Sequence, residues 1–468
     1  MKKYYTLSPK QLEDWNYNFG LRDNYPPNIM DLGVEIDSLD ISVFEKAYAQ
    51  LIRDNESLRT SFPKIDGKIL QRIEEYSERF QLEYINEVLD MDLNDFIAEK
   101  IMMLKDLQST PLIKGFVVSR LNGSFFIYII VHHIVSDFWS VKIIREQLFE
   151  NYQKISADLP IFHAPERVQL GDYFLRLNKA TLPEHHKQTM ETLEGELANC
   201  DWQVDYDLIH RNLSKLFTEM TLAPPKHSWK DYDSSTLIAN PTGETFITLL
   251  NEKLSLQVKQ FCTKHSKGTN SVMLAGLFVL GTLVTSLDNL LIQTHYMNRD
   301  DPQAHSVIGN LIGKLLLMMK VNKNLSSLEF IEECNLIFYG AISKVIFNSN
   351  DIKDFNTTIR NLIFYNFISK EMSGNQKIKF ETPKFKPGVW VESPLVFQGF
   401  EYGNTIEIKW SFHLDFFDRD SITCISGLFE NIIGELVNSK ESSIKQIINE
   451  LKSSSFILPE IGDSQVEL

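Results

Sequence analysis

The chain has 468 residues, of which 43% are hydrophobic and 23% charged, an ordinary balance for a globular protein whose length favours two domains over a single core. Its 62 acidic residues outnumber its 47 basic residues and give a net charge of −15. This balance argues against a nucleic-acid partner, because phosphate contacts need Lys and Arg.

Cysteine spacing and the length of apolar runs indicate the redox compartment of the protein and argue against a zinc site, a signal peptide and a membrane span. The four cysteines are far apart and form no C-x-x-C, which predicts a reduced, cytoplasmic protein with neither a disulfide framework nor a zinc site. The N-terminus, M-K-K-Y-Y-T-L-S-P, lacks the apolar core of a signal peptide. The longest apolar run, Val272–Val284, is shorter than the roughly 20 residues that span a bilayer, so a buried helix is expected.

Residues 1–180 are expected to form a first α/β lobe. Helical patterns cover Ser8 to Phe19 (through Gln11, Leu12 and Trp15), Asp40 to Ile52, Asn94 to Leu104 and Ser140 to Lys154. Strand patterns cover Asn28 to Ile36, a hairpin from Arg59 to Ile73, Phe80 to Ile85, Pro111 to Leu121 and Ser124 to Val131. Asn122-Gly123 joins the last two strands as a hairpin, because both residues tolerate positive φ.

Residues 181–243 are expected to cross to a second lobe, 244–452, followed by a polar tail, 453–468. The crossing begins with a polar helix, on which the pair His185 and His186 is interpreted as solvated surface, and continues irregularly over 201–241. Strands are expected at 244–250, 290–297, 315–321, 361–367 and 405–416, and helices at 251–265, 271–287, 325–346 and 422–436. The tail is expected to be frayed or to dock a partner.

One stretch carries the candidate chemistry: Val131 to Ser140, V-H-H-I-V-S-D-F-W-S. The apolar run before it has no polar face, which suits a strand buried on both sides. Ser136 or Asp137 is expected to cap the helix that follows. A histidine at the end of a buried strand can accept a proton near neutral pH. The competing interpretation is a core histidine whose polar atoms are hydrogen-bonded.

The motif H-H-x-x-x-D, formed by His132, His133 and Asp137, resembles the signature of the condensation domains of nonribosomal peptide synthetases. That family belongs to the acyltransferase superfamily that includes chloramphenicol acetyltransferase. Other segments resemble family segments in the same order, from Leu7 to about Leu436: Leu7-Ser8-Gln11-Trp15, Arg53–Phe62, Leu170–Phe174 and Ile308–Lys314.

The resemblance implies a mixed α/β (α+β) fold of two chloramphenicol acetyltransferase-like lobes that form a V-shaped pseudo-dimer with a central tunnel. It implies acyl transfer from a carrier-protein thioester to an amine, or less favourably a hydroxyl, giving an amide or ester in nonribosomal peptide, hybrid or antibiotic biosynthesis. No covalent cofactor and no metal are expected, because phosphopantetheine would arrive on an acyl or peptidyl carrier protein in trans. The acceptor would be a small amine or carrier-bound, and the chain a monomer without a membrane partner.

The resemblance also assigns residues. His133 would be catalytic, orienting or deprotonating the acceptor, while His132 would pack behind it. Asp137 would need a cation, since burying an unpaired carboxylate is costly, and Arg299 is favoured over Arg59 as that cation. Substrate-tunnel candidates are Phe138, Ser140, Asn361 and Tyr365, with strand core as the competing interpretation for the last two.

Three positions depart from the family pattern: Asn55 replaces a His, Phe138 replaces a Gly and Gly313 replaces an Asn. The Phe138 ring could turn away and leave its backbone N–H to an oxyanion, narrow the acceptor side, or mark an inactive site. Three alternatives to acyl transfer from a carrier therefore stay open. They are a catalytically silent platform that binds carrier proteins, an acyltransferase that uses coenzyme A thioesters, and epimerisation of a tethered peptide.

Overall fold

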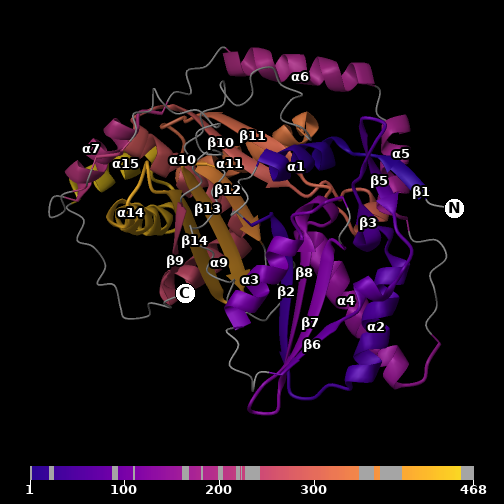
Figure 1. Ribbon diagram of the computed structural model, residues 1–468. Helices are drawn as coiled ribbons and strands as arrows, with labels where there is room; N and C mark the ends of the chain where they lie inside the picture. The colour runs from indigo at the N-terminus through magenta and orange to yellow at the C-terminus, as the bar shows by residue number, and fades with distance from the viewer. Residues whose placement is uncertain are drawn as a thin grey trace. The chain divides into compact units, whose positions relative to one another are not determined.

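The computed structural model (Figure 1) describes residues 3–20, 26–86, 93–108, 111–160, 168–180, 183–198, 204–217, 222, 224–226, 243–346, 363–368 and 393–454. They form two compact units. Unit 1 holds the described residues up to Lys187 together with Met297–Gly313. Unit 2 holds those of Gln188–Tyr296 and those from Lys314 onward.

Met297–Gly313 lies with unit 1, although the chain-order boundaries expected above place it in the second lobe. The physical reason is a buried ion pair between Arg299 in this segment and Asp137 in unit 1. The expected boundaries at residues 180, 243 and 452 stay a prediction.

The main sheet of unit 1 has the strand order β2-β8-β7-β6. Strand β8 runs antiparallel to β2 and β7, and β6 runs parallel to β7. Helices α2 and α4 lie side by side along one face, as Figure 1 shows, and α3 packs on the other. These elements are β2 (Ile29–Ile36), α2 (Ile41–Asp54), β6 (Glu83–Asn86), α3 (Leu93–Met103), β7 (Ile113–Ser119), β8 (Phe125–His132) and α4 (Phe138–Ser156).

Strand β8 is buried on both faces. Ile127 and Ile129 pack into the cluster formed with α2 and α4, whereas Tyr128 and Ile130 pack into the cluster formed with α3. The expectation of a strand with two buried faces is therefore confirmed. Helix α4 begins at Phe138, two residues before the expected start, because Asp137 caps it and its side chain accepts from the backbone N–H of Ser140.

Helix α1 (Pro9–Gly20) turns a polar stripe inward. Gln11, Asp14 and Asn18 are buried, whereas Leu12 and Phe19 are 37% and 50% exposed. Beside α1 lies a small sheet of order β1-β5-β3, with β4 also paired to β5, in the region of the expected hairpin. Its strands are β1 (Lys3–Thr6), β3 (Thr60–Ser61), β4 (Lys64–Ile65) and β5 (Lys68–Ile73), and α5 (Leu170–Ala180) follows later in the chain.

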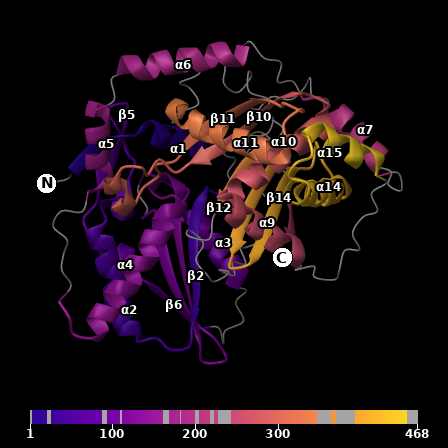
Figure 2. The same cartoon turned by 180° about the vertical axis from the view of Figure 1, so that it is seen from behind.

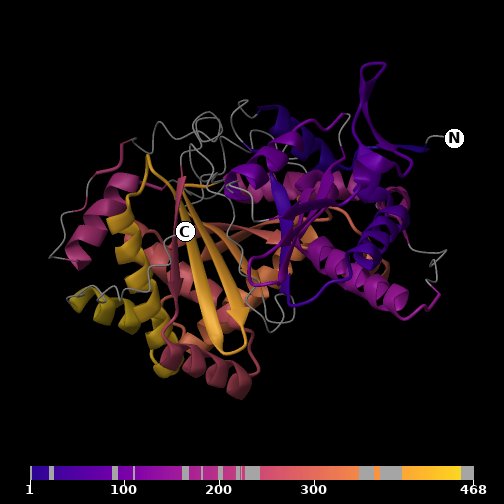
Figure 3. The ribbon, with the colours of Figure 1, turned by 60° about the horizontal axis from the view of Figure 1, so that its bottom comes forward.

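Unit 2 is built on a six-stranded sheet of order β11-β10-β12-β13-β14-β9. Strands β10, β12 and β13 are parallel, whereas β14 runs antiparallel to β13 and β9. Figure 3 shows β13 and β14 as a long orange-to-yellow hairpin. The strands are β9 (Gly243–Leu249), β10 (Asn289–Tyr296), β11 (Gly313–Lys320), β12 (Ile363–Ile368), β13 (Leu395–Tyr402) and β14 (Thr405–His413).

Helix α10 (Thr269–Thr285) is the centre of this unit and is buried from Ser271 to Thr285, as the apolar run predicts. Helices α7, α9, α11, α14 and α15 share its hydrophobic cluster, and Figure 2 shows α10, α14 and α15 gathered together. On the other face of the sheet, α6 (Pro183–Ala198) packs through Met190, Leu193 and Leu197. The remaining bounds are α7 (Tyr206–Leu216), α9 (Glu252–His265), α11 (Ser327–Ala341), α14 (Arg419–Asn438) and α15 (Ile444–Ser453).

Three of the described elements of unit 2 were not predicted. Helix α7 lies where irregular chain was expected; Asp205 caps it, and Ile209 and Leu213 are buried in the core. Strand β13 and helix α15 had no predicted counterpart. Most of the polar tail, 455–468, lies outside the described residues.

Among the described helices, none is by itself long and apolar enough to cross a membrane. Only the bent pair α9 and α10 passes such a test of length and composition, and only when the two are taken together.

Candidate functional site

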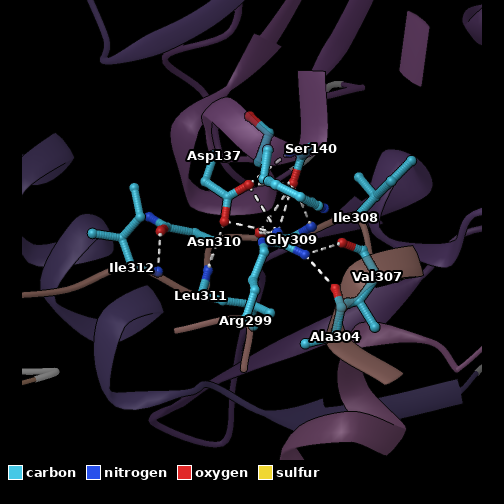
Figure 4. Close-up of polar contacts among 12 residues, drawn as sticks. Asp137, Ser140, Arg299, Ala304, Val307, Ile308, Gly309, Asn310, Leu311 and Ile312 are labelled. Atoms are coloured by element: carbon cyan, nitrogen blue, oxygen red, sulfur yellow. Dashed lines mark hydrogen bonds and ion pairs between the residues drawn. The ribbon is translucent and has the colours of Figure 1, made fainter. Parts of the chain in front are cut away.

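The site is organised by Arg299, whose guanidinium is buried in unit 1 (Figure 4). Nη2 donates to both carboxylate oxygens of Asp137 at 2.8 Å and to the carbonyl of Gly309 at 3.1 Å. Nη1 donates to the carbonyls of Ala304 and Val307. One cation therefore ties the start of α4 to the segment that returns from unit 2.

Both carboxylate oxygens of Asp137 accept further hydrogen bonds besides those from Arg299. Oδ1 accepts from the backbone N–H and the hydroxyl of Ser140, both at 2.7 Å, and Oδ2 accepts from the backbone N–H of Leu311 at 3.2 Å. The side chains of Asp137 and Arg299 are only 1% and 3% exposed. Such burial is tolerable because the two charges are paired and further hydrogen bonds satisfy both carboxylate oxygens and both terminal guanidinium nitrogens.

The loop around Gly309 is held close to both α4 and α5. The Gly309 backbone N–H donates to the Ser140 hydroxyl at 3.0 Å. A Cβ on Gly309 would come within 2.3 Å of the buried Leu170 side chain of α5, so a larger residue here would force Leu170 to move. This close approach gives a physical reason for the Ile308-Gly309 pair in the segment that resembles the family.

His132 is a buried structural histidine. Its Nδ1 accepts from the backbone N–H of Ile134 at 3.0 Å, so the neutral ring carries its hydrogen on Nε2, which faces Asn18 Oδ1 at 3.3 Å. Burial lowers the pKa of His132 to about 3. His132 thus makes hydrogen bonds that hold the turn after β8.

His133 begins the short 3₁₀ turn after β8 (His133–Val135) and is partly exposed. Its Nδ1 lies 2.9 Å from Nδ2 of Asn310, which is fully buried. No described residue makes a hydrogen bond to its Nε2. Of the two motif histidines, only His133 therefore has a ring nitrogen left for another molecule.

Several expected site residues lie elsewhere. Arg59 does not pair with Asp137; it donates to the backbone carbonyls of Glu74 and Arg53. Ser140 is fully buried and bonded within the Asp137–Arg299 network, and its expected place in a substrate tunnel stays a prediction. Tyr365 is buried in the core of unit 2, where its hydroxyl bonds to Asn270.

Two further expectations are not decided by the structure. Asn361 lies outside the described residues. Phe138 is the first residue of α4 and is partly buried, and the three consequences expected of its ring stay predictions.

Sequence reasoning missed the polar residues that support the histidines. Asp14 accepts from Asn310 Nδ2 at 2.7 Å, and Lys10 pairs with Asp14 at 2.8 Å. Gln11 donates to the carbonyl of Ile134 at 3.5 Å. The available signal was the spacing of Gln11, Asp14 and Asn18, which lie on one face of a helix.

Breaking the buried pair should destabilise unit 1. We expect Arg299→Ala to lower the free energy of unfolding by about 3–5 kcal/mol, because Asp137 would be left charged and buried. The exposed i,i+4 pair Lys154–Glu150 supplies a control: Lys154→Ala should cost no more than about 0.5 kcal/mol. Urea unfolding measures both, and equal losses for the two variants would contradict the role assigned to Arg299.

His132 predicts a pH dependence of stability. Because its pKa falls to about 3 in the folded protein, the neutral ring stabilises the fold above the unfolded-state pKa near 6.5, and this contribution is lost as the pH falls toward 3. The His132→Asn side chain cannot titrate. The difference in unfolding free energy between wild type and His132→Asn should therefore shift by about 2 kcal/mol in favour of the variant between pH 6.5 and 4.5. Urea unfolding at several pH values measures this difference; a gap that stays constant would refute the assignment.

Comparison with known protein sequences identifies the family of this chain. The sequence model of the condensation domain matches residues 29–453. Bacitracin synthase 2 of Bacillus licheniformis is 21% identical over 464 residues, 95% of this chain, and the chain spans 16% of that protein's length.

Solved structures show the same mixed α/β, chloramphenicol acetyltransferase-like fold, which confirms the expected fold. The condensation domain of the monacolin K polyketide synthase MokA has a TM-score of 0.71 at 11% identity, covering 94% of this chain and 98% of that one. The X-domain from teicoplanin biosynthesis, also solved in complex with OxyB, has a TM-score of 0.70 at 16% identity, covering 94% and 96%. The epimerization domain from the third module of tyrocidine synthetase B has a TM-score of 0.69 at 14% identity, covering 97% and 99%.

The family match covers nearly the whole chain and includes the H-H-x-x-x-D motif, the buried Asp137–Arg299 pair and the Gly309 loop. The protein therefore belongs to the condensation domain family of nonribosomal peptide synthetases.

Proposed function

We propose that this chain transfers an acyl group from the phosphopantetheinyl thioester of a carrier protein to an amine. The observation that carries the proposal is His133: a partly exposed imidazole, held by the buried Asn310, with Nε2 unbonded to any described residue. A ring fixed on one side and open on the other can contact reacting atoms with little reorganisation.

In this reaction the acceptor nitrogen attacks the thioester carbon, a C–N bond forms and the C–S bond breaks. One proton moves from the nitrogen to the sulfur, so that the carrier keeps a free thiol. Negative charge collects on the carbonyl oxygen in the transition state, and a positioned hydrogen-bond donor stabilises it. A hydroxyl acceptor would give an ester by the same bond changes.

The thioester arm is a substrate in this proposal, delivered by an acyl or peptidyl carrier protein in trans. The acceptor is a small amine or an amine on a second carrier. A monomeric state and a cytoplasmic location stay predictions.

The test is intact-mass analysis of an acyl-loaded carrier protein incubated with this protein and a panel of free and carrier-bound amines. Wild type should form product, and His133→Ala should lower the rate by at least about 100-fold because it removes the group nearest the reacting atoms. His265→Ala on α9, in unit 2, is the matched control and should keep the wild-type rate. Equal rates for wild type and His133→Ala would overturn the proposal.

Two features favour one further candidate, a platform that binds other proteins without turnover. Phe138 stands where the family motif has Gly, and the X-domain of similar fold forms a complex with OxyB. Carrier binding without product across the whole amine panel would support this platform. Replacing the carrier thioester by an acyl-coenzyme A thioester in the same assay tests the coenzyme A alternative, and loss or scrambling of the donor's stereocentre tests epimerisation.

A further inference from the structure

The hydrogen-bond partners of the Asn310 side-chain amide determine which of its two positions holds the oxygen and which the nitrogen. Oδ1 lies 3.2 Å from the backbone nitrogen of Ile312, which can only donate. Nδ2 lies 2.7 Å from Oδ2 of Asp14, whose carboxylate accepts when ionised. Reversing the amide would set oxygen against oxygen and N–H against N–H. Asn310 therefore donates toward Asp14.

Asp14 forms an ion pair with Lys10. Lys10, one turn earlier on α1, places Nζ 2.8 Å from Oδ1 of Asp14, so a cation balances the carboxylate while its other oxygen receives Asn310. Asp14 is 9% exposed and Asn310 is fully buried. Water competes poorly for these contacts, so the amide orientation is fixed by the protein.

The second hydrogen of Asn310 Nδ2 faces Nδ1 of His133, at 2.9 Å between the nitrogens. A nitrogen that accepts this hydrogen cannot carry one of its own, so the neutral ring carries its hydrogen on Nε2. Turning the ring over would put a carbon in the place of Nδ1 and leave the amide hydrogen without an acceptor. Both the tautomer and the ring orientation of His133 thus follow from Asn310.

We propose that Asn310 is a positioning residue that holds His133 as the Nε2–H tautomer, so that His133 donates a hydrogen bond from Nε2 instead of accepting a proton there. The chemical group it would recognise is the thioester carbonyl oxygen, which gains negative charge as the acceptor attacks. This inference rests on the proposed acyl transfer for its substrate, but the tautomer itself is a property of the protein alone. The acceptor's proton must then leave by another route, such as directly to the departing sulfur.

The tautomer can be read by NMR of the full chain labelled with ¹⁵N-histidine, with His133→Ala identifying the His133 signals. Wild type should show Nδ1 without hydrogen and Nε2 with hydrogen in the neutral ring. Asn310→Asp replaces the donor by an acceptor and should move the hydrogen to Nδ1. Asn122→Asp, in the exposed turn between β7 and β8, makes the same chemical change and should leave the His133 signals unchanged.

A wild-type spectrum with the hydrogen on Nδ1 would overturn the inference without any variant. If Asn310→Asp does not fold, because its carboxylate meets that of Asp14, the combined change with Asp14→Asn restores one donor and one acceptor at that contact. An unchanged tautomer in a folded variant of either kind would also overturn it.

The donor role is tested separately by turnover of His133→Gln against His133→Ala. A glutamine amide can place an N–H near the position of Nε2 but is no base. If His133 donates, His133→Ala should lose about 10²–10³-fold in kcat and His133→Gln should retain at least about tenfold more activity than His133→Ala. Equal losses in the two variants would overturn the donor role.

The outcomes for the two proposals are distinct. Wild type that shows the Nε2–H tautomer but transfers no acyl group contradicts the proposed function and leaves the tautomer assignment standing. Wild type that transfers acyl groups with the hydrogen on Nδ1 contradicts the inference and leaves the function standing.

Discussion

The buried pair of Asp137 and Arg299 is the interaction on which the site depends. Removing two charges from water is costly, and the pair is tolerated because Asp137 accepts from Ser140 and Leu311 while Arg299 donates to three backbone carbonyls. The same bonds fix the start of α4 and the loop that follows Arg299. His133 lies in the turn that directly precedes α4 and Asn310 lies in that loop, so the ion pair helps to fix the distance between them.

Helix α1 supplies the other half of the frame. Gln11, Asp14 and Asn18 reach the Ile134 carbonyl, Asn310 and His132 respectively. An amphipathic helix ordinarily turns such residues to water. Here the buried face of α1 is polar because the turn that it covers has backbone and ring atoms with no other hydrogen-bond partner in the part of the chain that the structure describes. Burying those atoms without partners would cost more free energy than burying the polar side chains that pair with them.

The strongest sequence signals were local. The apolar run of β8 predicted burial on both faces, and Asp137 was one of two expected helix caps. The partner of Asp137 had two candidates, and the geometry selects Arg299. Asp14 and Asn310 could not be found in this way, because their contact joins residues 296 apart in sequence and neither is a defining position of the family segment in which it lies. The burial of Ser140 was not predicted either, because a capping serine and a pocket serine look alike in sequence.

Unit 1 is completed by Met297–Gly313, which follows Gln188–Tyr296, the first part of unit 2, in the sequence. On the ribosome, the strand that carries the histidine motif is therefore made long before Arg299 and Asn310 emerge. Until then the Asp137 carboxylate has no cation, and the first unit cannot reach its final core on its own. Closing contacts this distant in sequence is entropically slow, so the two units must mature together and not one after the other as their order in the chain suggests.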